Sequence, residues 1–409
     1  MSMKIIRNAR IVDGSTDRAS DPKDIVIENG RFREVADKVT ITAETEIDAA
    51  GHHVLPGLID CHVHVIATDA NLGANAEVQN SLLAYRAMGL MKNMIMRGFT
   101  TVRDLGGADQ GIVDAIEERL ITAPRLVICG KALSQTGGHT DYRGRYNPRS
   151  VEFYRGQIGA MGRVVDGVDD VRRACREEIK AGATFIKVMA NGGVSSPTDP
   201  IGFLGFSMAE LEAAVEEARN AETYVSGHLY TDEAINRALD AGFYSIEHAN
   251  LIKRETVKRV VEAGAAVIPT NITYELLAKD GARFGLPPES VEKVSVVLDA
   301  GIEALTMLHE EGALMGYGSD LLGGMQPHQS GEFELRGRHI PAHDVIRSAT
   351  LDAAKVMRMD GQIGAIKEGA FADLIFVDGN PLDDLTLLAD QGAHMPVIMK
   401  DGALVKNSL

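Results

Sequence analysis

Cysteine is scarce in this sequence of 409 residues, and tryptophan is absent. The three cysteines are odd in number and form no Cys-x-x-Cys pair, so neither a disulfide framework nor a zinc knuckle is predicted. Cys61 stands between two histidines in the sequence but on the opposite face of a predicted strand, where a small packed side chain is expected. This cysteine usage favours a reducing, cytoplasmic location.

Long apolar runs are also missing. No uncharged segment approaches the ~20 apolar residues of a membrane-spanning helix, and the N-terminus lacks the apolar stretch of a signal peptide. Basic residues are too few for a nucleic-acid partner, because 42 Lys and Arg stand against 58 Asp and Glu, a net charge of −16. We therefore expect neither secretion, nor a membrane, nor nucleic acid as a partner.

Both ends of the chain are rich in short strand patterns. Residues 24–28 and 31–35 flank Asn29-Gly30, and such a pair between alternating segments is the strongest short-range signal for a hairpin. Near the C-terminus, residues 372–378 and 396–405 have the same character. We expect the two ends to join in one small sheet domain.

Between these ends, short apolar strands alternate with amphipathic helical segments. The strand patterns lie at 58–64, 101–104, 126–129, 185–189, 224–228, 245–248, 267–270 and 314–320. Helical periodicity is found at 168–181, 208–221, 231–241 and 255–263, with Gly182, Gly242 and Gly264 at the expected C-caps. Eight strand-helix units predict an α/β fold, a (β/α)8 barrel. The loop at 134–165 is long enough to suggest a functional role.

Polar residues end five of these strands. They are His62 and His64 on the first strand, Lys187 on the fourth, His228 on the fifth, His248 on the sixth and Asp320 on the eighth. The carboxyl ends of the strands form the active-site face of such a barrel, and alternate strand residues point the same way. Imidazole and carboxylate groups converging there predict a metal site.

With this order of residues, the sequence resembles the amidohydrolase superfamily over its whole length. It is most similar to the prolidase-like, imidazolonepropionase-related branch of dipeptidases and carboxypeptidases that act on Xaa-Pro, Xaa-Arg or Xaa-Lys substrates. Further matching stretches are 99–104, 132–139, 192–199, 246–251 and 372–375. The resemblance implies a TIM barrel at residues 56–361 and a small β-sandwich domain built from residues 1–55 and 362–409.

The resemblance also implies a binuclear zinc site. His62, His64 and Asp320 would hold one zinc ion, and His228 and His248 would hold the other. Lys187 would bridge both ions as a carbamate formed with carbon dioxide, because a free ammonium has no lone pair to offer a cation.

Roles in catalysis follow from the same resemblance. A hydroxide bridging the metals would attack the scissile carbonyl, and Asp320 would act as general base and then as general acid. His139 corresponds to the histidine that faces the carbonyl oxygen, and Tyr230 to the tyrosine that contacts the terminal carboxylate of the substrate. Arg143 and Arg145 are further candidates for binding a carboxylate.

We therefore expect a homo-oligomeric dipeptidase or carboxypeptidase whose substrate is a dipeptide or an N-acyl amino acid. The same site could serve N-acyl amino acids, ureas or carbamates, because its chemistry does not depend on which acyl derivative is presented. A deaminase is disfavoured because its mononuclear branch typically has a glutamate where Thr231 stands and lacks the bridging lysine. The complete ligand set argues against an inactive scaffold protein.

Overall fold

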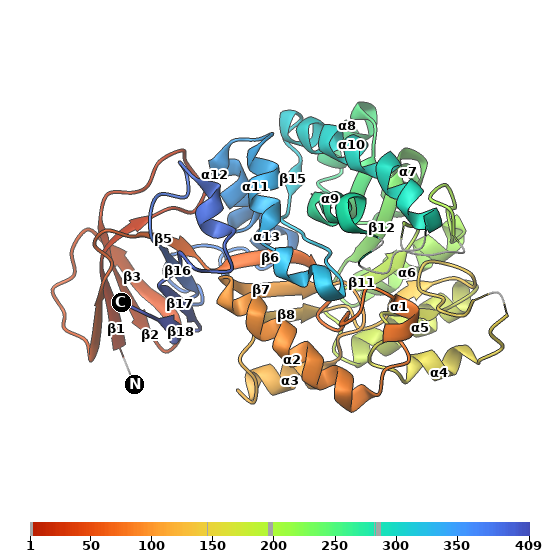
Figure 1. Cartoon of the computed structure of the whole chain (residues 1–409), viewed down its shortest axis with the longest axis horizontal. Coiled ribbons are helices and arrows are strands. Elements are labelled where there is room, and N and C mark those ends of the chain that lie inside the picture. Colours follow the sequence, from red (N-terminus) through yellow and green to blue (C-terminus); the bar gives the residue numbers. More distant parts are fainter. Residues whose placement is uncertain (1–2, 145, 195–198, 282, 284–287) are drawn as a thin grey trace.

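The two ends of the chain meet in one small sheet, which carries both termini at one side of the molecule (Figure 1). The computed structural model describes all residues except 1–2, 145, 195–198, 282 and 284–287. The strands of this sheet are β1 (Met3–Ile11), β2 (Lys23–Glu28), β3 (Arg31–Ala36), β4 (Thr45–Asp48), β5 (His53–Pro56), β16 (Leu374–Val377), β17 (Val397–Lys400) and β18 (Ala403–Asn407). They pair in the order β18-β17-β16-β5-β1-β2-β3, with β4 beside β1.

Tight turns shape two hairpins of this sheet. Asn29 and Gly30 join β2 to β3 with φ of 53° and 78°, and Asp401 and Gly402 join β17 to β18 with φ of 49° and 70°. Two successive positive φ angles are the mark of a turn whose twist matches that of antiparallel strands. The hairpin predicted around Asn29-Gly30 is confirmed.

The rest of the described chain alternates strands with helices. The strands are β6 (Leu58–Val63), β7 (Phe99–Asp104), β8 (Arg125–Ile128), β9 (Ala132–Ser134), β10 (Gly162–Val164), β11 (Ile186–Met189), β12 (Val225–Thr231), β13 (Ser245–Leu251), β14 (Ala266–Ile268) and β15 (Leu314–Met315). Each of the eight predicted strand segments overlaps one of these strands. All their ladders are parallel, as expected where helices separate consecutive strands.

The parallel strands form two ladders, β6-β7-β8 and β10-β9-β11-β12-β13-β14-β15. Hydrogen bonds of residues next to the second ladder link the two: Thr184 N donates to Ile128 O at 2.9 Å, Cys61 N to Tyr317 O at 2.7 Å and Asp320 N to His62 O at 2.9 Å. The eighth predicted strand is shorter than expected, because only Leu314 and Met315 pair within a ladder. A fully closed barrel of eight strands therefore stays a prediction.

Helices cover the outer side of these strands. They are α1 (Leu72–Asn75), α2 (Asn80–Met96), α3 (Gln110–Glu117), α4 (Val151–Arg155), α5 (Val168–Lys180), α6 (Met208–Asn220), α7 (Asp232–Ala241), α8 (Arg254–Glu262), α9 (Asn271–Asp280), α10 (Pro288–Glu310), α11 (Gly331–Gly337), α12 (Ala342–Ser348) and α13 (Leu351–Val356), with short 3-10 helices at Gly323–His328 and Leu385–Leu388. Gly182, Gly242 and Gly264 have φ of 106°, 96° and 63°, which confirms the predicted helix ends.

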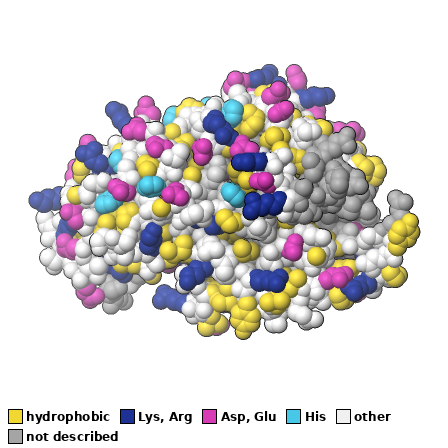
Figure 2. Space-filling view, viewed as in Figure 1, with side chains coloured by type: hydrophobic (Ala, Val, Ile, Leu, Met, Phe, Trp, Pro, Cys, Tyr) yellow, Lys and Arg dark blue, Asp and Glu magenta, His cyan; other side chains and the backbone are white. Residues whose placement is uncertain are grey.

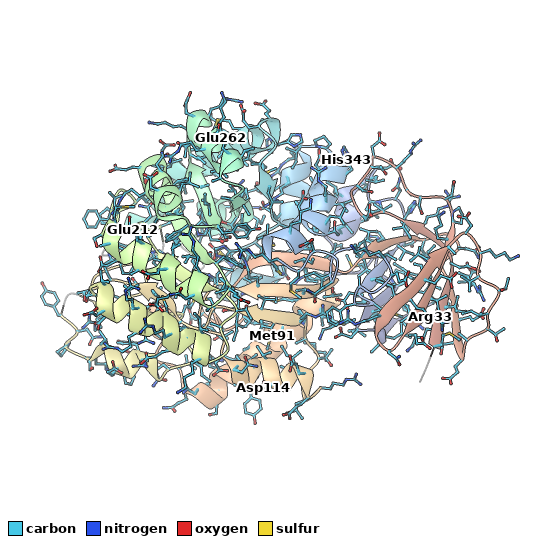
Figure 3. All side chains as sticks on the ribbon, turned by 180° about the vertical axis from the view of Figure 1, so that it is seen from behind. Arg33, Met91, Asp114, Glu212, Glu262 and His343 are labelled. Atoms are coloured by element: carbon cyan, nitrogen blue, oxygen red, sulfur yellow. The ribbon has the colours of Figure 1, made fainter. Side chains whose placement is uncertain are left out.

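The interior has an apolar layer between strands and helices, and a polar centre among the strands. Figure 3 shows exposed Asp114, Glu212 and Glu262 on helices that surround the strands. By contrast, Arg103, Lys187 and Glu247 lie on strands and are at most 1% exposed. Charged groups almost never sit this deep without paired charges or a ligand, so this centre is where chemistry is expected.

None of the helices in the described ranges is both long and apolar enough to cross a membrane. On the face drawn in Figure 2, acidic and basic side chains are interspersed.

Candidate metal centre

His62 and His64 project from the carboxyl end of β6 toward the same carboxylate. His62 Nε2 lies 3.4 Å and His64 Nε2 3.2 Å from Asp320 Oδ1. Burial alone would raise the pKa of Asp320, but the adjacent imidazoles of His62 and His64 hold it well below its usual range. Asp320 is thus an ionised carboxylate facing two imidazole nitrogens, which is a donor set suited to zinc.

The segment that carries Asp320 is held beside β6 by hydrogen bonds rather than by a ladder. Asp320 N donates to His62 O at 2.9 Å, and Ser319 Oγ donates to the buried Asp60 at 2.6 Å. Asp320 itself has φ of 51°, a left-handed conformation that is uncommon outside glycine. These bonds keep the strained residue in place, and such strain clusters at functional sites.

His228 of β12 and His248 of β13 form a second pair. His228 Nδ1 and His248 Nε2 lie 2.9 Å apart, and burial holds the pKa of each imidazole well below its usual range. Two neutral imidazoles therefore turn ring nitrogens toward each other. Neutral imidazole is the form that binds metals.

Lys187 lies on β11 and points into the same centre. Its Nζ is buried and has no hydrogen-bond partner within the described part of the chain. Burial lowers its pKa to about 8, despite the opposing effect of Glu247. An amine of this kind loses its proton easily, and a neutral amine can react with carbon dioxide.

The ligand atoms of His62, His248 and Asp320 all lie within 4.8 Å of one another. His62 and Asp320 are expected to bind one zinc ion, whereas His248 is expected to bind the other. The second oxygen of Asp320 faces His248, with Oδ2 3.9 Å from Nδ1. The two expected ligand sets are therefore adjacent. Their imidazole and carboxylate groups are ligands that suit neighbouring divalent metal ions.

Glu247 and Arg103 support this centre and were missed by sequence reasoning. Glu247 Oε2 accepts from His62 Nδ1 at 2.9 Å, while Oε1 accepts from Arg103 Nη2 at 2.8 Å. Ser226 and Ser245 also donate to Oε1, at 2.7 and 2.6 Å. A carboxylate on Nδ1 leaves Nε2 of His62 free for a metal.

A local signal for Glu247 existed, but strand alternation concealed it. Consecutive residues of a regular strand point to opposite faces, so His248 in the site would turn Glu247 away. Instead both side chains contact the site, and the backbone departs from strand geometry, with φ of 72° at His248 and 56° at Ala249. The acidic residue directly before the histidine was the clue.

His139 lies against the second histidine pair. Its ring stacks on that of His228, with centroids 4.3 Å apart and 19° between the planes. Its Nδ1 lies 3.4 Å from Oδ2 of the buried Asp199. A Cβ atom on Gly193 would lie 2.0 Å from Cε1 of His139, so only glycine leaves room for this ring. The structure thus brings His139 to the predicted metal centre.

The other predicted substrate-binding residues have different surroundings. Tyr230 is buried and its hydroxyl lies 2.8 Å from that of Tyr274, a residue that sequence reasoning missed. The guanidinium of Arg143 donates from Nε and Nη2 to Asp141, each bond 2.8 Å long. Arg145 lies outside the described residues.

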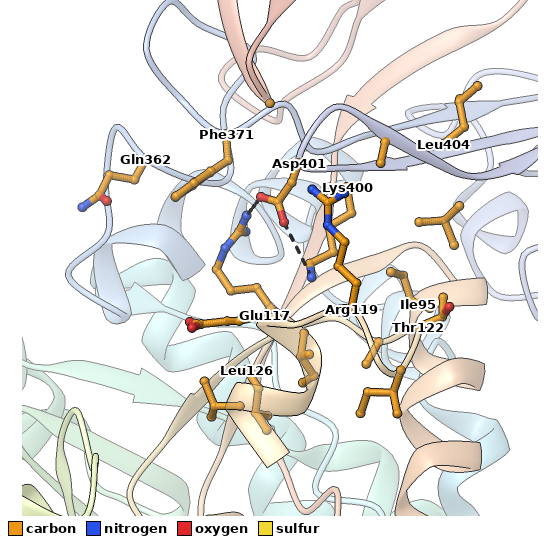
Figure 4. Close-up of a pocket in the computed structure, with 18 of the residues that line it drawn as sticks. Ile95, Glu117, Arg119, Thr122, Leu126, Gln362, Phe371, Lys400, Asp401 and Leu404 are labelled. Carbon is orange, nitrogen blue, oxygen red and sulfur yellow. Dashed lines mark hydrogen bonds and ion pairs between the residues drawn. The ribbon is translucent and has the colours of Figure 1, made fainter. Parts of the chain in front are cut away.

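A separate cavity of about 750 Å³ lies between the small sheet and the helices α2 and α3 (Figure 4). Arg125, at the start of β8, bonds Asp373 and Asp401, and Lys400 Nζ lies 3.6 Å from Asp401. None of the predicted site residues that the structure describes lines this cavity. The ion pairs of Arg125 join the small sheet to β8.

Comparison with known proteins gives consistent matches. The model of the amidohydrolase family matches residues 53–405. Ochratoxinase of Aspergillus niger is 31% identical over 373 residues, covering 86% of this chain and 75% of that protein. Among solved structures, a prolidase in complex with N-methylphosphonate-L-proline is 46% identical, with a TM-score of 0.97 and 100% of both chains covered. A Xaa-Pro dipeptidase with bound methionine is 29% identical, with a TM-score of 0.86, covering 99% of this chain and 100% of that one.

Proposed function

Because this chain belongs to the amidohydrolase family and is a hydrolase of amide bonds, we propose that it is a binuclear zinc dipeptidase or carboxypeptidase. It cleaves an amide next to a free C-terminal carboxylate, of the Xaa-Pro, Xaa-Arg or Xaa-Lys type. The fold is α/β, of the TIM-barrel type found in that family. One observation carries the proposal: ligand atoms of His62, His248 and Asp320, which come from three different strand ends, all lie within 4.8 Å of one another. Similarity to a prolidase and a Xaa-Pro dipeptidase supports the substrate class.

Each metal-binding residue has a defined part in the proposal. His62, His64 and Asp320, which lie together, would hold one zinc ion, and the adjacent His228 and His248 would hold the other. Lys187 would bind both ions once carbon dioxide has converted its amine to a carbamate. This is supported by the isolation of its Nζ among the described residues and by a pKa of about 8, caused by burial.

Zinc ions in such a site supply a water that ionises near neutral pH and polarise the scissile carbonyl. Asp320, ionised and next to the histidines, accepts the proton of the attacking water and then donates it to the leaving amine. His139 donates a hydrogen bond to the oxyanion that develops on the carbonyl. Tyr230 donates to the terminal carboxylate and so orients the substrate. Arg143 and Arg145 are secondary candidates for the same carboxylate.

We propose the domain bounds as predicted, with a β-sandwich domain at residues 1–55 and 362–409 and the barrel at 56–361. The bonds from Thr184 to Ile128 and from Cys61 to Tyr317 support closure of the two parallel ladders into one (β/α)8 barrel. The cytoplasmic location and the homo-oligomer that the sequence suggests stay predictions.

The test combines metal analysis with a substrate panel. After purification and zinc loading, we expect about two zinc ions per chain, and chelation should abolish activity. The panel pairs each dipeptide with its C-terminal amide, and adds N-acyl amino acids, ureas and carbamates. We expect turnover of the free acids and a strong loss with the amides. Turnover of ureas or carbamates alone would contradict the peptidase assignment and leave the metal site intact.

A further inference from the structure

A line of hydroxyl groups connects a predicted metal ligand with the predicted substrate-binding tyrosine. The hydroxyls of Tyr230 and Tyr274 lie 2.8 Å apart, and Tyr274 Oη lies 3.1 Å from His248 Nδ1. Thr270 Oγ1 is the other neighbour of that nitrogen, at 2.8 Å. Both tyrosines are at most 3% exposed, so each hydroxyl proton needs an acceptor inside the protein or on a bound substrate rather than bulk water.

The proton on His248 sets the direction of these hydrogen bonds. A neutral imidazole carries one proton, on Nδ1 or on Nε2. His248 Nε2 faces His228 Nδ1 at 2.9 Å. When His248 gives the Nε2 lone pair to a cation, its proton must lie on Nδ1. Nδ1 then donates toward Thr270 and Tyr274 and can accept from neither.

The proton position on His248 also decides whether Tyr230 can donate a hydrogen bond to a substrate. Tyr274 has two hydroxyl neighbours, Thr270 and Tyr230. With Nδ1 donating to Thr270 Oγ1 at 2.8 Å, Thr270 passes its own proton toward Tyr274, and Tyr274 gives its proton to the oxygen of Tyr230 at 2.8 Å. Tyr230 accepts that bond and keeps its own proton for a further acceptor. Without a cation, His248 can hold its proton on Nε2 and donate to His228. All the bonds then reverse, and Tyr230 donates inward to Tyr274.

We propose that Tyr274 is a positioning residue that makes Tyr230 a hydrogen-bond donor to the substrate's terminal carboxylate when His248 holds a metal. The inference rests on the proposed function, and it adds that recognition of the carboxylate depends on the metal. Tyr274 acts only through Tyr230 and does not touch the reacting atoms.

The experiment measures binding of L-proline and L-prolinamide by calorimetry, with zinc-loaded and with chelated full-length protein. Tyr274→Phe removes only the hydroxyl. In loaded protein we expect it to weaken L-proline binding about tenfold, the effect of one hydrogen bond to a charged group, and L-prolinamide binding less than about twofold. In chelated protein it should change neither. Zinc content should equal that of the parent, and KM for a dipeptide should rise with kcat nearly constant.

Tyr244→Phe is the matched control, because its hydroxyl donates to Lys355 O at 3.0 Å beside the start of β13, at the opposite end of the strand from the site. It should leave both affinities unchanged. Unaltered L-proline binding by loaded Tyr274→Phe would overturn the inference, and so would an equal loss with and without zinc. If the parent binds L-proline no better than L-prolinamide, it is the proposed function that fails, and the inference fails with it.

Discussion

The buried ion pair of Glu247 and Arg103 offers a sharp test of how the metal centre is built. Both side chains are 0% exposed, and Glu247 accepts from Arg103, His62, Ser226 and Ser245. Glu247→Gln preserves shape but removes the charge. Wherever its amide nitrogen lies, it must face a group that donates, either His62 Nδ1 or the donors on the other oxygen.

The expected loss is large for a single substitution. Removing one partner of a buried, hydrogen-bonded ion pair costs about 3–5 kcal/mol, because the remaining charge stays buried without compensation. Natural domains have only about 5–15 kcal/mol of stability in total. We expect Glu247→Gln to lower the free energy of unfolding by that amount and to weaken zinc binding through His62. Urea unfolding of chelated protein, followed by circular dichroism, measures the first effect without the contribution of metal.

Two control variants distinguish the loss of the Glu247–Arg103 ion pair from a general effect of replacing Glu by Gln. Glu212→Gln makes the same chemical change on the exposed face of α6 (Figure 3) and should alter stability by less than about 0.5 kcal/mol. Arg103→Met combined with Glu247→Gln should cost less than the sum of the single variants, because neither charge is then left alone. A Glu247→Gln protein as stable as Glu212→Gln, or strictly additive costs, would refute the reasoning.

Three further predictions concern other parts of the molecule. Lys187→Ala should lose bound zinc and activity, and a short-chain carboxylic acid should restore part of both. Full activity of Lys187→Ala without added acid would exclude the bridging role. Gly193→Ala should push His139 out of place, since the new Cβ would lie 2.0 Å from Cε1, and lower kcat about 100-fold at unchanged zinc content. An unchanged kcat would place His139 outside the reaction. Burial lowers the pKa of Lys131 from 10.5 to about 8, so the folded protein releases this proton first and stability should rise between those pH values. In Lys131→Met, the free energy of unfolding measured in urea should lack this contribution to its rise with pH. If the free energy of unfolding of parent and variant rose in parallel with pH, the prediction would be contradicted.

Much of the fold could be predicted because it depends on local patterns. The eight strand segments and the helix ends at Gly182, Gly242 and Gly264 follow from periodicity and from the φ angles that glycine permits. The eighth strand was predicted too long, because apolar character cannot show that residues after Met315 leave the ladder to bring Asp320 beside β6. Two extra strands were also missed: β9, directly before the long loop, and β10, near the end of that loop.

The sequence by itself determined the kinds of ligand and their order: a His-x-His pair, a lysine, two histidines and an aspartate, each at the end of an apolar strand. Only the tertiary structure decided which groups support them. Arg103 meets Glu247 across 144 residues of chain, and Tyr230 meets Tyr274 across 44. Such partners depend on how strands and helices pack, and backbone distortion at His248 turned Glu247 inward against the strand pattern. Chain order carries no record of these contacts, because side chains distant in sequence become neighbours only when the core forms.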